Sequence, residues 1–177
     1  GSRVAVVGEF AEIPRYQGAG SSLVNPTKVE NLLDHLKGKG LNLLGYAKGY
    51  SRESDGADLE LIDRACAEEK PDFVVLPEMF CCPYSNKYFR EYGEEWNGPA
   101  QKALSGAAKR HGIYLIGGSL PELEDDRVYN TSFVYDREGK QIARHRKAHL
   151  FDIDVPGGQR FFESEVLTPG QETTTFE

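Results

Sequence analysis

Glu78 occupies the position in this sequence that is best suited to acid–base chemistry. It directly follows a short apolar segment, residues 72–76, and a proline, and Cys81 and Cys82 come three and four residues after it. A carboxylate can remove a proton from a thiol, and the thiolate is then a nucleophile. On spacing alone, the simpler interpretation is a strand-end carboxylate followed by two partly buried, inert thiols.

Lys147 and Glu163 are two further charged residues of interest. Lys147 ends the short basic run 144–147, and Glu163 follows two phenylalanines. Taken alone, Lys147 is best interpreted as a solvated basic residue. His145 and His149 are four residues apart with aspartates nearby, which are ligand types that zinc accepts. Because this spacing falls on a predicted strand end and loop rather than on one helix face, we expect no metal site.

A glycine- and serine-rich stretch, residues 18–22, precedes a predicted helix and could hold an anion through its backbone N–H groups. However, the lysine of a phosphate-binding loop does not follow Gly20. We therefore interpret the stretch as a structural turn, and we expect no cofactor.

Composition narrows the classes of function. The 177 residues carry a formal net charge of −7, which argues against binding to nucleic acid or to an anionic membrane, because both need a concentrated basic patch. The longest apolar runs are of strand length, so no membrane-spanning helix is expected. Three cysteines, two of them adjacent, do not make a disulfide framework and favour a reducing, cytoplasmic location. The opening Gly1-Ser2 is typical of tag removal and indicates recombinant expression.

The pattern of apolar residues predicts alternating strands and helices. Strands are expected at residues 3–7, 41–46, 72–76 and 113–116. Helices are expected from Asn25-Pro26 to Gly38, over residues 57–70, and from Gly98-Pro99 to Gly112. Residues 129–135 and 141–145 are expected to form an antiparallel hairpin, and the chain after Lys147 is expected to be mostly loop.

This order of elements predicts a single α/β domain over residues 1–177. Its sheet should be mixed but mostly parallel, with about six strands and helices packed on it. Right-handed crossovers then place the first four strands in the order second, first, third, fourth. Residues 41–46 should therefore lie at an edge of the sheet, and residues 3–7 should lie beside residues 72–76.

Five segments between residues 71 and 177 carry a family pattern: LPEMFCCPYSNKYFREY, IYLIGGSLPE, VYNTSFVYDREGK, HRKAHLFDIDVPGG and FFESEVLTPG. Together they resemble the omega-amidase-like branch of the nitrilase superfamily. The resemblance implies cleavage of an amide carbon–nitrogen bond through a cysteine acyl-enzyme, with release of ammonia. It also implies a role for three residues, Glu78 as the base, Lys147 as the cation that stabilises the oxyanion, and Glu163 as a second glutamate that helps to orient the site.

Residues 3–50 carry a different pattern, of which PRYQGAGSSLVNP is the specific part. They resemble the opening of the C-terminal α/β domain of glycoside hydrolase family 3 β-glucosidases. Two resemblances in one chain predict a chimera, with a glycosidase-like segment at residues 3–56 and a nitrilase-like segment at residues 57–177. In this interpretation, a glycosidase-derived β-α-β unit extends half of a nitrilase sheet.

In the nitrilase family, the nucleophilic cysteine follows a later strand, beyond the Thr-Pro-Gly found here at residues 168–170. Cys81 and Cys82 lie in a different loop. We therefore expect an engineered or recombinant chimera without an intact active site, and not an enzyme. Two alternatives stay open: an omega-amidase-like carbon–nitrogen hydrolase that acts on linear amides, and a remnant module that binds a small amide.

Half of a nitrilase domain should leave a sheet face or a sheet edge exposed. Such a surface is usually covered by another chain, so we expect a symmetric homodimer.

Overall fold

The computed structural model describes residues 3–7, 12–13, 28, 30–37, 39, 42–47, 63, 66 and 70–176. Its N-terminal part holds strand β1 (Arg3–Val7), helix α1 (Leu32–Lys37), strand β2 (Asn42–Ala47) and strand β3 (Phe73–Val75). Helices α3 (Asn86–Phe89) and α4 (Pro99–His111) follow. The remaining elements are strands β4 (Tyr114–Ile116), β5 (Leu120–Glu124), β6 (Arg127–Tyr135), β7 (Gln141–Arg146), β8 (Asp152–Asp154) and β9 (Arg160–Phe162), and the 3-10 helix η3 (Glu163–Glu165).

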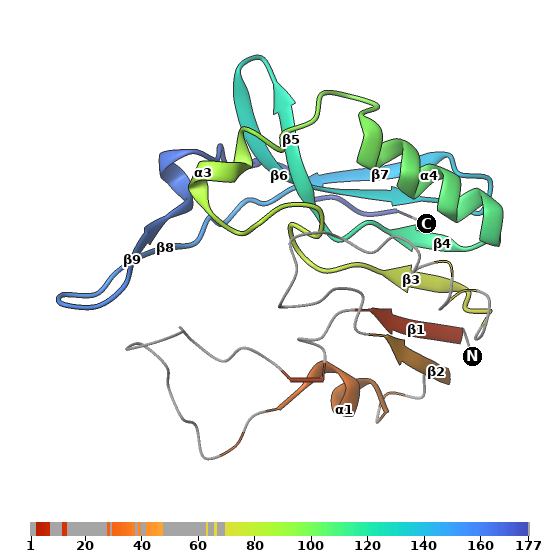
Figure 1. Cartoon of the computed structure of the whole chain (residues 1–177). Coiled ribbons are helices and arrows are strands. Elements are labelled where there is room, and N and C mark those ends of the chain that lie inside the picture. The colour runs from red at the N-terminus through yellow and green to blue at the C-terminus, as the bar shows by residue number, and fades with distance from the viewer. Residues whose placement is uncertain are drawn as a thin grey trace.

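Within the described residues, the main sheet has seven strands in the order β2-β1-β3-β4-β6-β5, with β7 also paired to β6 (Figure 1). This confirms the predicted order of the first four strands, with β2 at the edge and β1 beside β3. The pairings β1–β2, β1–β3 and β3–β4 are parallel, whereas β4–β6, β5–β6 and β6–β7 are antiparallel. The sheet is therefore evenly mixed, rather than mostly parallel.

Short connections explain the antiparallel half of the sheet. Strands β5 and β6 are joined by Asp125 and Asp126, whose φ angles of 49° and 60° are those of a two-residue hairpin turn. The predicted hairpin of β6 and β7 is also present, and Gly139 in its turn has a φ of 78°. Connections of this length cannot make a crossover, so the strands that they join must run antiparallel.

The chain after Lys147 was expected to be mostly loop, but it forms a second sheet from β8 and β9. Figure 1 shows this blue hairpin projecting from the main sheet near α3. Both strands are only three residues long, and none of their residues is fully buried. Such strands bury too little apolar surface to leave an alternating pattern in the sequence. The hairpin matters for the site because η3, which begins at Glu163, follows it directly.

Helix α4 packs on β4 and β6 and covers the main core. It begins at Pro99 after Gly98, as predicted, and it ends at Gly112, whose φ of 60° lies in the left-handed region that favours glycine. The core beneath it combines side chains of the helix with side chains of β3, β4 and β6: Leu104, Ala107, Ala108, Val74, Leu115 and Phe133. This packing fixes the ends of β3 and β4, from which the two loops of the site begin.

Helix α1 begins later than predicted. Lys28 and Glu30 are not helical, and Asn31 caps a helix that starts at Leu32, because the Asn31 Oδ1 accepts a hydrogen bond of 2.7 Å from the backbone N–H of Asp34. The predicted start at residue 25, the stretch 18–22 and most of the helix expected over residues 57–70 lie outside the described residues. Among the helices that are described, none is long and apolar enough to cross a membrane.

Candidate active site

Glu78 lies in a turn whose backbone is fixed on both sides by Ser119. The Ser119 N–H donates to the Pro77 carbonyl at 3.2 Å, and the Phe80 N–H donates to the Ser119 carbonyl at 3.1 Å. The Met79 N–H donates to the Ser119 Oγ at 2.9 Å. Ser119 is buried, so these bonds are shielded from water. The turn after β3 is thus attached to the loop between β4 and β5.

Close contact between these two loops requires a glycine. Gly118 has a φ of 54°, and a Cβ atom there would lie 2.0 Å from the Pro77 carbonyl oxygen and 2.6 Å from that of Leu76. Met79, although not a glycine, also has a left-handed φ of 50° and is buried. Such conformations cost about 1–3 kcal/mol and are found most often where a site is held in a set geometry.

Lys147 follows β7 and is fixed by two backbone hydrogen bonds. Its N–H donates to the Asn130 carbonyl at 2.8 Å, and its carbonyl accepts from the Gly170 N–H at 2.9 Å. The Lys147 Nζ lies 2.9 Å from Glu78 Oε1, 3.1 Å from Glu163 Oε1 and 3.0 Å from Glu163 Oε2. One ammonium therefore bridges two carboxylates, and the structure brings together all three residues that the sequence indicated.

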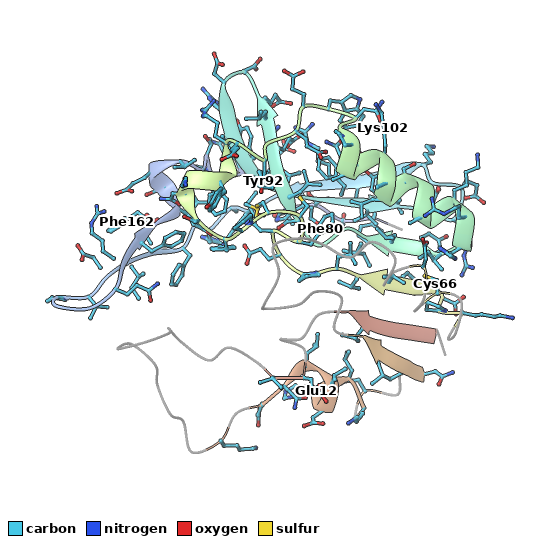
Figure 2. The ribbon with its side chains drawn as sticks, viewed as in Figure 1. Glu12, Cys66, Phe80, Tyr92, Lys102 and Phe162 are labelled. Atoms are coloured by element: carbon cyan, nitrogen blue, oxygen red, sulfur yellow. The ribbon has the colours of Figure 1, made fainter. Side chains whose placement is uncertain are left out.

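Glu163 is fully buried, and both of its carboxylate oxygens are paired. Oε1 accepts from the Tyr84 hydroxyl and from Lys147, and Oε2 accepts from Lys147 and, at 2.6 Å, from the Phe151 N–H. A buried carboxylate needs such partners, because removing its charge from water is otherwise very costly. Figure 2 shows the two segments that carry Glu78 and Glu163: Phe80 marks the turn after β3, and Phe162 marks the end of β9.

The electrostatics of the site keep Lys147 charged. Burial favours the neutral amine, but hydrogen bonds and charges from Glu78 and Glu163 outweigh it, and the pKa of Lys147 is raised. Burial, and then the hydrogen bond to Glu163, raises the pKa of Tyr84, so its hydroxyl stays a proton donor. Two carboxylates around one ammonium give the site a formal charge of about −1.

Sequence reasoning missed Asn130, Tyr84 and Ser119. The Asn130 Nδ2 donates to Glu78 Oε1 at 2.7 Å, and Tyr84 contacts Glu163. Asn130 did leave a signal, because an amide in the middle of an apolar strand must find a buried partner. Nothing local distinguished Tyr84 or Ser119 from ordinary loop residues, since their partners lie 79 and 40 positions away in the chain.

In the part of the chain that the structure describes, the cysteines take no part in the hydrogen bonds of this site. Burial raises the pKa of Cys81 to about 12 and that of Cys82 to about 11. The Cys82 Sγ lies 4.0 Å from the Met79 Sδ, and within the described residues no cysteine is hydrogen-bonded to Glu78. Cys66 is buried near Asp63, and burial raises its pKa to about 11. All three thiols are therefore poor nucleophiles at neutral pH.

His145, considered above as a metal ligand, lies with its Nδ1 3.2 Å from the Thr174 Oγ1. In the part of the chain that the structure describes, no group of three or more His, Cys, Asp or Glu side chains is arranged to hold a metal ion. The charged groups of the site are instead paired with one another.

Comparison with known proteins identifies relatives for most of the chain. The family described as carbon-nitrogen hydrolase matches residues 47–177. Omega-amidase NIT2 of Xenopus tropicalis is 48% identical over 124 residues, which cover 67% of this chain and 45% of that protein. Omega-amidase NIT3 of Saccharomyces cerevisiae is 46% identical over 124 residues, or 66% of this chain and 42% of that protein.

A solved structure gives the same result for the fold. The crystal structure of Saccharomyces cerevisiae Nit3, described as a member of branch 10 of the nitrilase superfamily, aligns with a TM-score of 0.58 at 37% identity, covering 69% of this chain and 48% of that one. The chain thus spans less than half the length of these relatives.

These matches support the expected hydrolase alternative better than the expected inactive chimera. Neither the family match nor the relatives lend support to a glycosidase segment, and the family match begins at residue 47, inside the segment assigned to the glycosidase. The segment boundary near residue 57 stays a prediction.

Proposed function

The chain belongs to the carbon-nitrogen hydrolase family, and on this basis we propose that its site serves a hydrolase of omega-amidase type. The proposed substrates are monoamides of short dicarboxylic acids, which are converted to the diacid and ammonia. The observation that carries the proposal is the Lys147 ammonium, which lies within 3.1 Å of carboxylate oxygens of both Glu78 and Glu163.

The two carboxylates differ in a way that suits two different tasks. Glu78 is about half exposed, with 49% of its side chain accessible, whereas Glu163 is completely buried. The exposed carboxylate can exchange a proton with a substrate or a thiol, which is the work of a general base. The buried one has no access to substrate, so its proposed role is to hold Lys147 in place.

Protonation of Glu78 would also prepare Lys147 for its task. The ammonium has three N–H groups, and they face three carboxylate oxygens. When Glu78 takes the proton of the nucleophilic thiol that the family resemblance implies, it loses its charge, and its bond to Lys147 weakens. An N–H of Lys147 then becomes available to the oxyanion that develops on the amide carbon. Glu78 passes the proton to the leaving nitrogen, which departs as ammonia and leaves a thioester, and a water molecule that Glu78 deprotonates then releases the carboxylic acid and returns the thiol.

None of the three cysteines is assigned to the nucleophilic attack. Attack needs reacting atoms about 3–3.5 Å apart in an aligned geometry, and a thiol with an accessible thiolate form. Cys81 and Cys82 do not meet the second condition, because they are partly buried and their pKa values are raised to about 12 and about 11. The proposal therefore concerns the base, the cation and the second carboxylate of the site.

The test is ammonia release from succinamate and glutaramate by the full-length product of the encoding gene. We expect Glu78→Gln to lower kcat by a factor of roughly 100 to 10,000, which is the usual contribution of a general base. Glu91→Gln is the matched control, because Glu91 is exposed and lies outside the site. Equal rates in the two variants, or no release by the unmodified protein, would overturn the proposal. Binding of these amides without release would support the amide-binding module instead.

A further inference from the structure

Asn130 touches both charged partners of the site at once. Its side-chain Nδ2 donates to Glu78 Oε1 at 2.7 Å, and its backbone carbonyl accepts the Lys147 N–H at 2.8 Å. It lies on β6, paired with Pro121 of β5, and only 3% of it is exposed. A single buried residue of β6 therefore connects the turn that carries the base to the segment that carries the cation.

We propose that Asn130 is a positioning residue, which fixes Glu78 relative to Lys147 and directs proton transfer to Glu78 Oε2. This inference rests on the proposed function, because it assigns a task to each oxygen of the base. It adds a residue that the family resemblance did not indicate. It also predicts which oxygen of Glu78 carries the proton.

The two oxygens of Glu78 are in different surroundings. Oε1 accepts from Asn130 at 2.7 Å and from Lys147 at 2.9 Å, and the Tyr84 hydroxyl lies 3.5 Å away. Within the described residues, no hydrogen bond reaches Oε2. An oxygen whose two lone pairs already accept N–H groups cannot take a proton without losing one of them. Proton transfer at Oε2 leaves the contact with Asn130 intact.

An amide is well suited to this task because it is neutral at every pH. A second cation in its place would compete with Lys147 and stabilise the charged form of Glu78, which would make it a weaker base. A residue without a donor would let the carboxylate rotate about its terminal torsion, which has no strong preference of its own. The amide of Asn130 fixes the orientation without adding charge.

The experiment compares Asn130→Leu with Thr131→Val in the full-length product. Leucine resembles asparagine in size but has no donor. Thr131 is the next residue of β6, is equally buried, and donates to Glu122 instead of to the site, so it controls for a lost buried hydrogen bond. We expect Asn130→Leu to lower kcat for ammonia release by about 10- to 100-fold with KM changed by less than about twofold, and Thr131→Val to leave kcat unchanged.

A second variant covers the case in which Asn130→Leu does not fold. Asn130→Asp keeps the shape but introduces a carboxyl that donates only when it is protonated. We expect the ratio of its kcat to that of the unmodified protein to be low at neutral pH and to rise as the pH falls. Under a merely structural role, the dependence on pH would lie in the fraction of folded protein, and the ratio of kcat per folded molecule would not depend on pH; this result would overturn the inference.

An NMR measurement separates this inference from the proposed function. The Lys147 ammonium should give a protected ¹H–¹⁵N signal, which is assigned by its loss in Lys147→Met. We expect Asn130→Leu to broaden this signal and Thr131→Val to retain it. If the unmodified protein releases no ammonia, the proposed function fails and this signal alone decides the inference. An unchanged signal in Asn130→Leu, or equal broadening in both variants, would overturn it.

Discussion

Gly118→Ala should reveal how tightly the turn of Glu78 is held. At this position a methyl group must enter a space in which the Pro77 carbonyl oxygen would lie 2.0 Å from the new Cβ, which is about 1.4 Å inside ordinary contact. The Pro77 carbonyl cannot simply retreat, because it accepts the Ser119 N–H. The substitution therefore forces apart the two loops that position Glu78.

The matched control is Gly112→Ala at the end of α4. Gly112 has a φ of 60°, close to the 54° of Gly118, but a Cβ atom there would meet nothing within 4 Å. Both variants pay the cost of a left-handed alanine, about 1 kcal/mol. Gly118→Ala adds overpacking, about 1–3 kcal/mol, and the loss of about one backbone hydrogen bond, about 1 kcal/mol.

Urea unfolding and ammonia release provide the two readouts. We expect Gly118→Ala to lose about 2–4 kcal/mol more of the free energy of unfolding than Gly112→Ala. We also expect it to lower kcat by about 100-fold, because a displacement of about 1 Å can have that effect on catalysis. Equal losses of stability in the two variants would refute the argument that loop contact fixes Glu78.

Further predictions concern the lysine, the thiols and assembly. Lys147→Met should lower the free energy of unfolding by about 3 kcal/mol, because it leaves the buried Glu163 without its cation. The folded-state pKa of Lys147 is raised above its ordinary 10.5, so the stabilisation is complete below that pH and is lost as the pH rises through the folded-state value. Melting curves recorded as the pH is raised above 10.5 should show this fall, and Lys147→Met should reduce it. The raised pKa values of Cys81 and Cys82 should make their alkylation at about pH 8 at least about 100-fold slower in the native protein than in urea. Equal alkylation rates in the two conditions would show that the thiols are accessible in the native protein. A homodimer stays our expectation for this chain, and a monomer mass by light scattering at high concentration would contradict it.

The elements that the sequence predicted best are those with strong local signals. Strand β1 matches residues 3–7 because a short apolar run indicates a buried strand, and α4 matches because Gly98-Pro99 and Gly112 mark its ends. Strand β5 was missed because Pro121 and Glu122 argue against a buried strand. Glu122 is nevertheless buried, because Arg144, Arg146 and Thr131 pair with its carboxylate. Hydropathy cannot detect such compensation by distant residues.

The site was predicted only in part for a related reason. Glu78, Lys147 and Glu163 were indicated through the family resemblance, and the structure places them in contact. Their mutual geometry depends on Ser119, Asn130 and Tyr84, each of which contacts the site from another segment. Such contacts arise only once the sheet has formed, so a local pattern could indicate at most that the Asn130 amide needs a buried partner, and not which partner it finds.

Glu78 and Glu163 are proposed to act as one unit through Lys147, with Glu78 as the base and Glu163 holding the ammonium in place. The most direct test is a double-mutant cycle on ammonia release from glutaramate by the full-length product, with Glu78→Gln, Glu163→Gln and the combination. We predict that the double variant has about the same kcat as the worse single variant, because residues that act together lose their effect together. Losses that multiply, or a Glu163→Gln variant that folds and keeps full kcat, would contradict the account.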